Sequence, residues 1–186
     1  GRGAHYTRMT KEKIKEKEAN EPVRFVSLGG LEEVGRNMMF LEHKNEIVVI
    51  DAGLQFPEET TPGIDYIIPN TTYLANKQLN IKALIITHGH YDHIGALPYV
   101  ITKIGNPTIY CAAITKEMII KRHEEFRNLP KLNVEVIKAG DKVKFGKYFE
   151  AEFFDLDHTV PDTVGTIFRT PVGNIVHPGE YKLDRM

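Results

Sequence analysis

One loop constrains this chain more than any other stretch, because it places several metal-binding side chains directly after a strand pattern. Residues 81–86 form an apolar run rich in isoleucine, which is typical of a buried β-strand. The loop that follows carries His88, His90, Asp92 and His93. Imidazole and carboxylate groups are the usual ligands of zinc and related ions. This order predicts an α/β fold with a metal site at the end of a strand.

The composition is that of an ordinary globular domain. The 186 residues are 41% hydrophobic and 26% charged, and they are enough to bury one core. The net charge of −1 gives no general attraction to nucleic acid, so an RNA contact needs a local basic patch. The single cysteine, Cys111, lies in an apolar stretch and predicts a core thiol in a reducing compartment. No stretch is apolar enough to cross a membrane, and we expect a cytoplasmic protein.

Residues 1–21 are predicted to be a flexible charged extension, and residues 22–186 to be the folded domain. Strands are predicted at 23–28, 37–42, 46–51, 81–86, 108–111, 134–137, 142–145, 148–156, 165–169 and 174–177. Helices are predicted at 71–79, 94–104 and 115–128, of which the second begins directly after the metal loop. His43 and His123 are expected at the surface.

Further polar side chains stand where other predicted strands end, namely Asp51, His158 and Glu180. Strand ends in a layered α/β fold can converge on one edge. His88, His90 and His158 would then hold one ion and leave a position open for water. Asp51 would either cap a strand or support a metal-bound histidine.

Asp92 and His93 would begin a second metal site, and the carboxylate of Glu180 would bridge the two ions. Two ions about 3.5–4 Å apart can hold a hydroxide and clamp the oxygens of an in-line displacement. Such a site hydrolyses phosphodiesters, esters, thioesters or lactams, and the ligands alone do not distinguish these substrates.

The loop from His88 to His93 matches the HxHxDH signature of the metallo-β-lactamase superfamily. Flanking sequence resembles the ribonuclease J family, which belongs to the β-CASP group of these nucleases. The matching segments lie at residues 28–37, 50–58, 63–69, 87–99, 158–162 and 177–184. The resemblance implies an αββα sandwich and a 5′-to-3′ exoribonuclease with endonuclease activity. It also implies two zinc ions with a bridging hydroxide, and single-stranded RNA as the substrate.

Carried onto this sequence, the resemblance assigns the first zinc to His88, His90 and His158. It assigns the second zinc to Asp92 and His93. Manganese or magnesium would be alternatives to zinc, and a calcium ion would contact the backbone near residues 62–64.

The same resemblance gives Asp92, His93 and Glu180 the catalytic role and gives Asp51 the supporting one. His177 is expected to pack or hydrogen-bond beneath the site and is left out of the ligand set.

The chain departs from the family pattern in three ways. Glu180 replaces a bridging aspartate, which moves the carboxylate by about a bond length and weakens the second zinc site. Tyr91 replaces an acidic residue, points away from the metals and changes only the local charge. The β-CASP insertion and the closing segment are expected to be missing, so an edge and apolar surface are left exposed.

The expected incompleteness leaves other functions open. A homo-oligomer or a partner would supply the missing part. Alternatively, the chain is a metal-binding or assembly fragment without turnover. A third alternative is a small-molecule hydrolase of the same superfamily.

Overall fold

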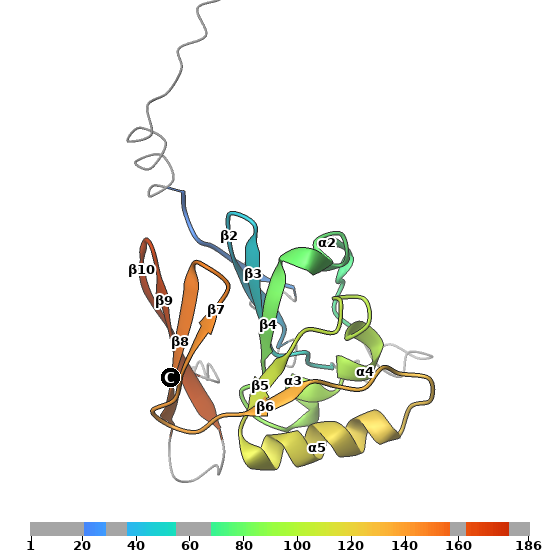
Figure 1. Ribbon diagram of the computed structural model, residues 1–186. Coiled ribbons are helices and arrows are strands. Elements are labelled where there is room, and N and C mark those ends of the chain that lie inside the picture. The colour runs from blue at the N-terminus through green and yellow to red at the C-terminus, as the bar shows by residue number, and fades with distance from the viewer. Residues whose placement is uncertain (1–20, 29–36, 55–67, 157–162, 179–186) are drawn as a thin grey trace, which may run out of the picture.

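The computed structural model describes residues 21–28, 37–54, 68–156 and 163–178, and these form two sheets and a group of helices. The predicted charged extension and the predicted calcium loop lie outside these residues, except Glu21. Figure 1 shows the four-stranded sheet on one side of the six-stranded sheet, with helices gathered on the other side.

The six-stranded sheet has the order β1-β2-β3-β4-β5-β6. Its strands are β1 (Arg24–Ser27), β2 (Met39–His43), β3 (Glu46–Ile50), β4 (Ile81–Ile85), β5 (Ile109–Cys111) and β6 (Val134–Val136). The four-stranded sheet has the order β10-β9-β8-β7. Its strands are β7 (Lys142–Phe145), β8 (Phe149–Asp155), β9 (Val164–Thr170) and β10 (Gly173–His177). The helices are α2 (Thr72–Ala75), the 3-10 turn η1 (Gln78–Asn80), α3 (Tyr91–Ile94), α4 (Leu97–Val100) and α5 (Ala113–Glu124).

Two apolar clusters hold these layers together. One lies between the six-stranded sheet and the helices and includes Phe40, Val49, Leu84, Leu97 and Ile119. The other lies between the two sheets and includes Leu41, Val48, Ile85, Phe153 and Phe168. Side chains that alternate along β2, β3 and β4 enter opposite clusters, as the period of a strand requires. The described residues therefore form a helix–sheet–sheet sandwich.

This architecture confirms the predicted α/β class and the predicted strands. The second helical layer of an αββα sandwich is not found among the described residues, whose helices pack into the first cluster. β6 and β10 end their sheets in this part of the chain, where Val136 and Val176 are about half exposed. An exposed edge and apolar surface are thus present. No helix in the described residues is long and apolar enough to span a membrane.

The topology brings two polar strand ends together. β3 and β4 are neighbours and run parallel, with Ile50 opposite Ile85. Their carboxyl ends therefore meet at the same edge of the sheet, and the backbone N–H of Asp51 donates to the Ile85 carbonyl. The residues that follow β3 and β4 are Asp51 and the histidine loop, which become spatial neighbours.

The single helix predicted at 94–104 is wrong. The structure has two one-turn helices instead, α3 and α4, followed by turns. The backbone N–H of Ala96 donates to the Ala52 carbonyl at 2.9 Å, so it leaves the helical hydrogen-bond ladder. A continuous apolar pattern cannot reveal this break, because the competing acceptor comes from a distant segment.

The prediction of a surface position for His43 is also wrong, because its side chain is 1% exposed. The β7–β8 turn covers the end of β2 and β3, and the Tyr148 ring meets the His43 ring edge-on at 4.9 Å. The Glu46 carboxylate fastens this turn by accepting the backbone N–H groups of Lys147 and Tyr148 at 2.7 and 2.8 Å. A buried carboxylate of one sheet therefore anchors the hairpin of the other.

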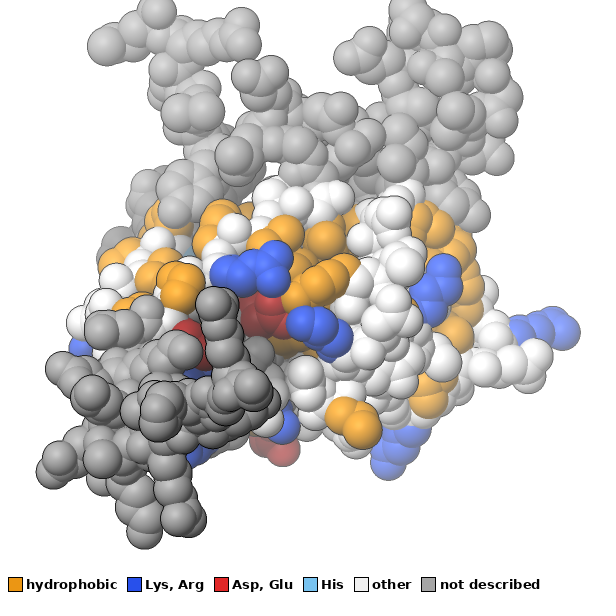
Figure 2. Space-filling view, turned by 90° about the horizontal axis from the view of Figure 1, so that it is seen from above, with side chains coloured by type: hydrophobic (Ala, Val, Ile, Leu, Met, Phe, Trp, Pro, Cys, Tyr) orange, Lys and Arg blue, Asp and Glu red, His pale blue; other side chains and the backbone are white. Residues whose placement is uncertain are grey.

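The end of the molecule near β2 and α2 shows basic side chains close to acidic ones (Figure 2). Arg24 of β1 and Lys77 bind the same buried Glu42 carboxylate at 2.9 and 3.1 Å. Tyr73 also donates to this carboxylate. Because Arg24 and Lys77 form ion pairs with Glu42, they do not make a free basic patch for RNA.

Cys111 is predicted to be unreactive in the folded chain. The thiol is buried at the end of β5, and burial raises its pKa to about 12. An ordinary cysteine thiol has a pKa of 9.0, so at pH 8 Cys111 is not extensively ionised in either the folded or the unfolded chain, and the folded thiol is also inaccessible. Because the pKa of Cys111 is higher in the folded than in the unfolded chain, the free energy of unfolding depends on its proton. The contribution of this proton is fully present below pH 9 and is lost as pH rises toward 12.

A disulfide reagent at pH 8 checks this expectation. The chain has one cysteine. We therefore expect no reacted thiol in the folded chain and one reacted thiol per chain in denaturant, read from the absorbance of the released reagent. Rapid labelling of the folded chain would contradict the buried position.

Candidate metal centre

His93 is held by a carboxylate at the end of β3. Oδ2 of Asp51 lies 2.8 Å from Nδ1 of His93, and both side chains are 1% exposed. Oδ1 of Asp51 accepts the backbone N–H of Thr87 at 2.8 Å, and Oδ2 accepts the Thr87 hydroxyl at 2.8 Å. Because Asp51 accepts the Nδ1 proton, Nε2 of His93 is left as the atom that can bind a metal.

Three candidate ligands converge around that nitrogen. Ligand atoms of His88, Asp92 and His93 all lie within 4.8 Å of one another. The His88 and His93 ring centroids are 3.6 Å apart, and Oδ2 of Asp92 is 3.4 Å from Nε2 of His93. Nδ2 of Asn37 lies 3.1 Å from the same Nε2 atom and borders the cluster. We call His88, Asp92 and His93 the metal cluster.

His90 lies beside the metal cluster and is exposed. Its ring centroid is 4.8 Å from that of His88, and the rings meet edge-on. It is also the residue before α3, in extended conformation, where the loop turns into the helix. The structure therefore places His90 next to His88, as the sequence predicts, although it is not one of the three converging residues.

The electrostatics of the metal cluster are strongly coupled. Burial works against the charged form of His93, but the carboxylates of Asp51 and Asp92 outweigh it and raise the pKa to about 10. Burial, together with the charge of His93, lowers the pKa of His88. The hydrogen bond to His93 lowers the pKa of Asp92, so this carboxylate stays ionised. A metal ion that replaces the proton on Nε2 of His93 would be attracted by the same two carboxylates, Asp51 and Asp92.

The residues present fit a divalent metal. Nδ1 of His88 is buried and has no hydrogen-bond partner among the described residues, which is costly for a polar atom unless something binds it. The cluster offers two imidazoles and one ionised carboxylate, a donor set that suits zinc. Asp51 supplies the carboxylate–histidine contact that commonly orients a metal ligand.

The other predicted ligands, His158 and Glu180, lie outside the described residues, as do residues 62–64. Strand β9, which begins soon after His158 in the sequence, does reach the sheet edge that carries the metal cluster. Val164 at the start of β9 donates its backbone N–H to the Thr87 carbonyl and pairs with Asp155 at the end of β8. His177 ends β10 and is 4% exposed. Burial lowers the pKa of His177, and the charges of Asp51 and His93 also act on it.

Sequence reasoning assigned no role to two neighbours of the cluster, Asn37 and Thr87. Asn37 follows a stretch of sequence that contains three glycines, and Thr87 comes directly before His88. Their position at the strand ends is the one signal that marks them. The contacts of Asn37 and Thr87 with the cluster depend on how distant segments pair in the tertiary structure, including β3 with β4. Local sequence patterns do not encode this pairing.

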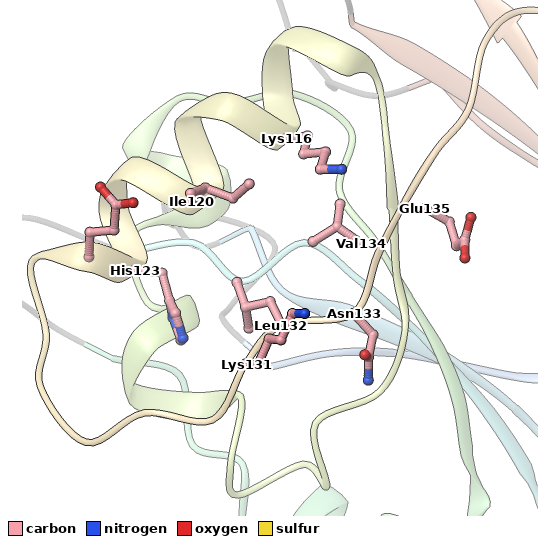
Figure 3. Close-up of a pocket in the computed structure, with 9 residues that line it drawn as sticks. Lys116, Ile120, His123, Lys131, Leu132, Asn133, Val134 and Glu135 are labelled. Carbon is pink, nitrogen blue, oxygen red and sulfur yellow. The ribbon is translucent and has the colours of Figure 1, made fainter.

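A separate cavity of about 540 Å³ lies between α5 and the segment that leads into β6 (Figure 3). Its lining includes Ile120, Leu132 and Val134 with Lys116 and Lys131. No member of the metal cluster lines it.

His123 also lines this cavity. It is half-buried, and its Nε2 atom is 2.8 Å from the Pro130 carbonyl, so the predicted simple surface position is wrong. The chain segment after α5 folds back and supplies this carbonyl.

The fold and the metal cluster define a class of protein. The model of the metallo-beta-lactamase superfamily matches residues 31–181. The chain belongs to this superfamily.

Curated relatives in this superfamily carry the name ribonuclease J. The protein of Thermus thermophilus is 41% identical over 87% of this chain, and that of Mycoplasma pneumoniae is 40% identical over 88%. The chain spans 29% and 28% of the length of these relatives. A crystal structure of a protein of unknown function from Enterococcus faecalis V583 has a TM-score of 0.65 at 18% identity, covering 87% of this chain and 44% of that one. This last likeness supports the fold alone.

Proposed function

We propose that this chain carries metal-binding residues of a zinc-dependent RNA phosphodiester hydrolase of the ribonuclease J type. The observation that carries the proposal is the convergence of His88, Asp92 and His93, with Asp51 orienting the last of them. Relatives named ribonuclease J match most of the chain, and this name supplies RNA as the substrate class. Cleavage from the 5′ end together with internal cleavage is the mode we propose.

Bound zinc would supply Lewis acidity toward a phosphate and would lower the pKa of a bound water toward about 7. The residues of this chain do the remaining work. Asp51 keeps the proton of His93 on Nδ1 and so leaves Nε2 for the metal. Asp92, with its lowered pKa, provides a negative oxygen at the partly exposed side of the cluster. On the buried side, Thr87 contacts both Asp51 and His93.

The remaining predicted ligands complete this proposal. His90 and His158 would join His88 at the first zinc, and Glu180 would bridge to the second. Manganese or magnesium would replace zinc if metal analysis finds them. Because the chain spans under a third of these relatives, we propose that further sequence or a partner supplies the rest of the RNA site.

Asp92→Asn tests this function. We expect RNA cleavage to fall about 1000-fold or more, because a charged ligand at the reacting centre is worth several kcal/mol. The side chain is 40% exposed, so the fold should survive the change. Labelled single-stranded RNA is added to the zinc-loaded chain, alone and with the part of a ribonuclease J relative that this chain does not span, supplied in trans.

Glu117→Gln is the matched control, because it neutralises an exposed carboxylate on α5 outside the cluster. Product length then reports end-directed or internal cleavage. Absence of cleavage by the parent chain under both conditions would refute the nuclease function, whereas equal rates for the parent and Asp92→Asn would refute the site.

A metal-binding module without turnover is a second candidate. It is favoured by the coverage, because the chain spans only 29% and 28% of the length of the relatives named ribonuclease J. Metal analysis separates the candidates, because one tightly held ion favours the module and two ions per chain favour the hydrolase.

A further inference from the structure

The helix that carries two of the proposed ligands cannot hold its own orientation. α3 has one turn, from Tyr91 to Ile94, and its first residue has no side-chain cap. A helix this short is not stable by itself in water, so contacts from outside must fix it. Asp92 and His93 will therefore sit correctly at a metal only if those contacts set the position of the turn.

One side of α3 rests on the segment that follows β3. Ala52 donates its backbone N–H to the His93 carbonyl at 2.8 Å, and Leu54 donates to the Tyr91 carbonyl at 3.2 Å. These bonds join the turn to the strand whose end holds Asp51. They hold the backbone of the turn, whereas the side chain of Tyr91 contacts another element.

Arg122 of α5 contacts α3 at both of its ends. Its Nη2 atom donates to the carbonyl of Gly95, the residue that ends α3, at 3.1 Å. Its guanidinium carbon lies 5.0 Å from the centre of the Tyr91 ring and 4.8 Å from that of Phe126. The side chain is 12% exposed, so these contacts are largely shielded from water.

Glu125 completes the arrangement. Its carboxylate pairs with Nη1 of Arg122 at 2.5 Å and accepts the Tyr91 hydroxyl at 3.4 Å. Phe126 in turn meets Tyr99 of α4 edge-on at 5.1 Å, so the next helix is tied to the same group. The planar guanidinium makes a hydrogen bond, an ion pair and two ring contacts together, which a lysine cannot reproduce.

We propose that Arg122, together with Tyr91 and Glu125, is a positioning clamp that orients α3 and thereby the metal ligands Asp92 and His93. Arg122 acts through α3 rather than by touching a metal or substrate. This role gives Tyr91 a function beyond a change in local charge. The inference rests on the proposed metal-binding function, but it does not require that the chain cleave RNA.

Cobalt binding tests the clamp without RNA. Co²⁺ serves as the probe, and its visible spectrum reports ligand geometry at the site. We expect Arg122→Met to weaken cobalt binding about 10- to 100-fold, the usual effect of losing a residue that orients a ligand, and to change the spectrum. Arg122→Lys should give an intermediate loss, because it keeps the charge without the planar fork.

Arg127→Met is the matched control, because this arginine is exposed and lies outside the clamp. Thermal unfolding of each metal-free variant separates a fold defect from a positioning defect. Equal cobalt affinity and spectrum in the Arg122 variants and the control would overturn the proposal, even if their unfolding temperature fell. If Arg122→Met does not fold, Arg122→Lys and Tyr91→Phe decide the outcome by the same spectrum.

Failure of the clamp and failure of the proposed function give different results. A chain that binds cobalt normally in all variants but cleaves RNA refutes the clamp alone. A chain that loses cobalt in Arg122→Met but never cleaves RNA supports the clamp and refutes the nuclease function. A parent chain that binds no cobalt overturns both.

Discussion

Asp51→Asn is expected to weaken zinc binding about 10- to 100-fold, because it removes the carboxylate that orients His93. Asp51 accepts from His93 on one side and from the backbone and hydroxyl of Thr87 on the other. An amide has one acceptor oxygen, so one of these donors loses its partner. The pKa of His93 should also fall, since Asp51 is the largest influence that raises it.

Asparagine is the right replacement because the backbone of Asp51 has a φ of 61°. Asparagine tolerates this left-handed conformation nearly as well as aspartate, whereas alanine would add strain. The measured effect then reports the lost charge rather than a displaced chain.

Competition with a zinc chelator measures the change in affinity, and thermal unfolding of the metal-free chain reports the fold. Asp141→Asn is the control, because Asp141 accepts a backbone N–H in an exposed turn. Zinc affinity unchanged from the parent chain would show that Asp51 only caps the end of its strand.

Gly53→Ala is expected to destabilise the fold by about 1–3 kcal/mol, the usual cost of forcing atoms into a packed site. It should also abolish tight metal binding. A Cβ at this position would lie 1.9 Å from the carbonyl oxygen of Asp92 and 3.0 Å from that of Asn37. Both obstacles are backbone atoms, so α3 itself must move, together with Asp92 and His93.

Gly89→Ala provides an informative comparison. It lies between His88 and His90, yet the atom nearest to its added Cβ is the sulfur of Met118, at the flexible end of a side chain on α5. We expect this variant to lose less stability than Gly53→Ala and to keep its metal. Denaturant unfolding and zinc titration measure both variants. Equal losses of stability and zinc affinity in Gly53→Ala and Gly89→Ala would contradict this expectation.

Much of the candidate site is local in sequence and could be predicted. His88, Asp92 and His93 are within six residues, and the apolar strand before them places them in a loop. Continuous apolar runs also located strands such as β3 and β4, since these strands are buried on both faces of the six-stranded sheet. Asp51 was singled out because it directly follows a strand of the same kind.

Other features were set by distant segments. The break between α3 and α4 depends on the Ala52 carbonyl, which takes the N–H of Ala96 from the helix. The burial of His43 depends on the hairpin around Tyr148, roughly a hundred residues later. Neither partner is visible in the local pattern, because residues in turns and strand ends look polar until another element covers them.

The sequence by itself determined the histidine loop and the α/β class, because neighbouring residues and apolar strand runs specify them. The tertiary structure alone decided how that loop is held. Parallel pairing of β3 with β4 brings Asp51 to His93, and the return of α5 brings Arg122 to the carbonyl of Gly95. A one-turn helix has too few hydrogen bonds to orient its own side chains, so its geometry must come from residues that are remote along the chain.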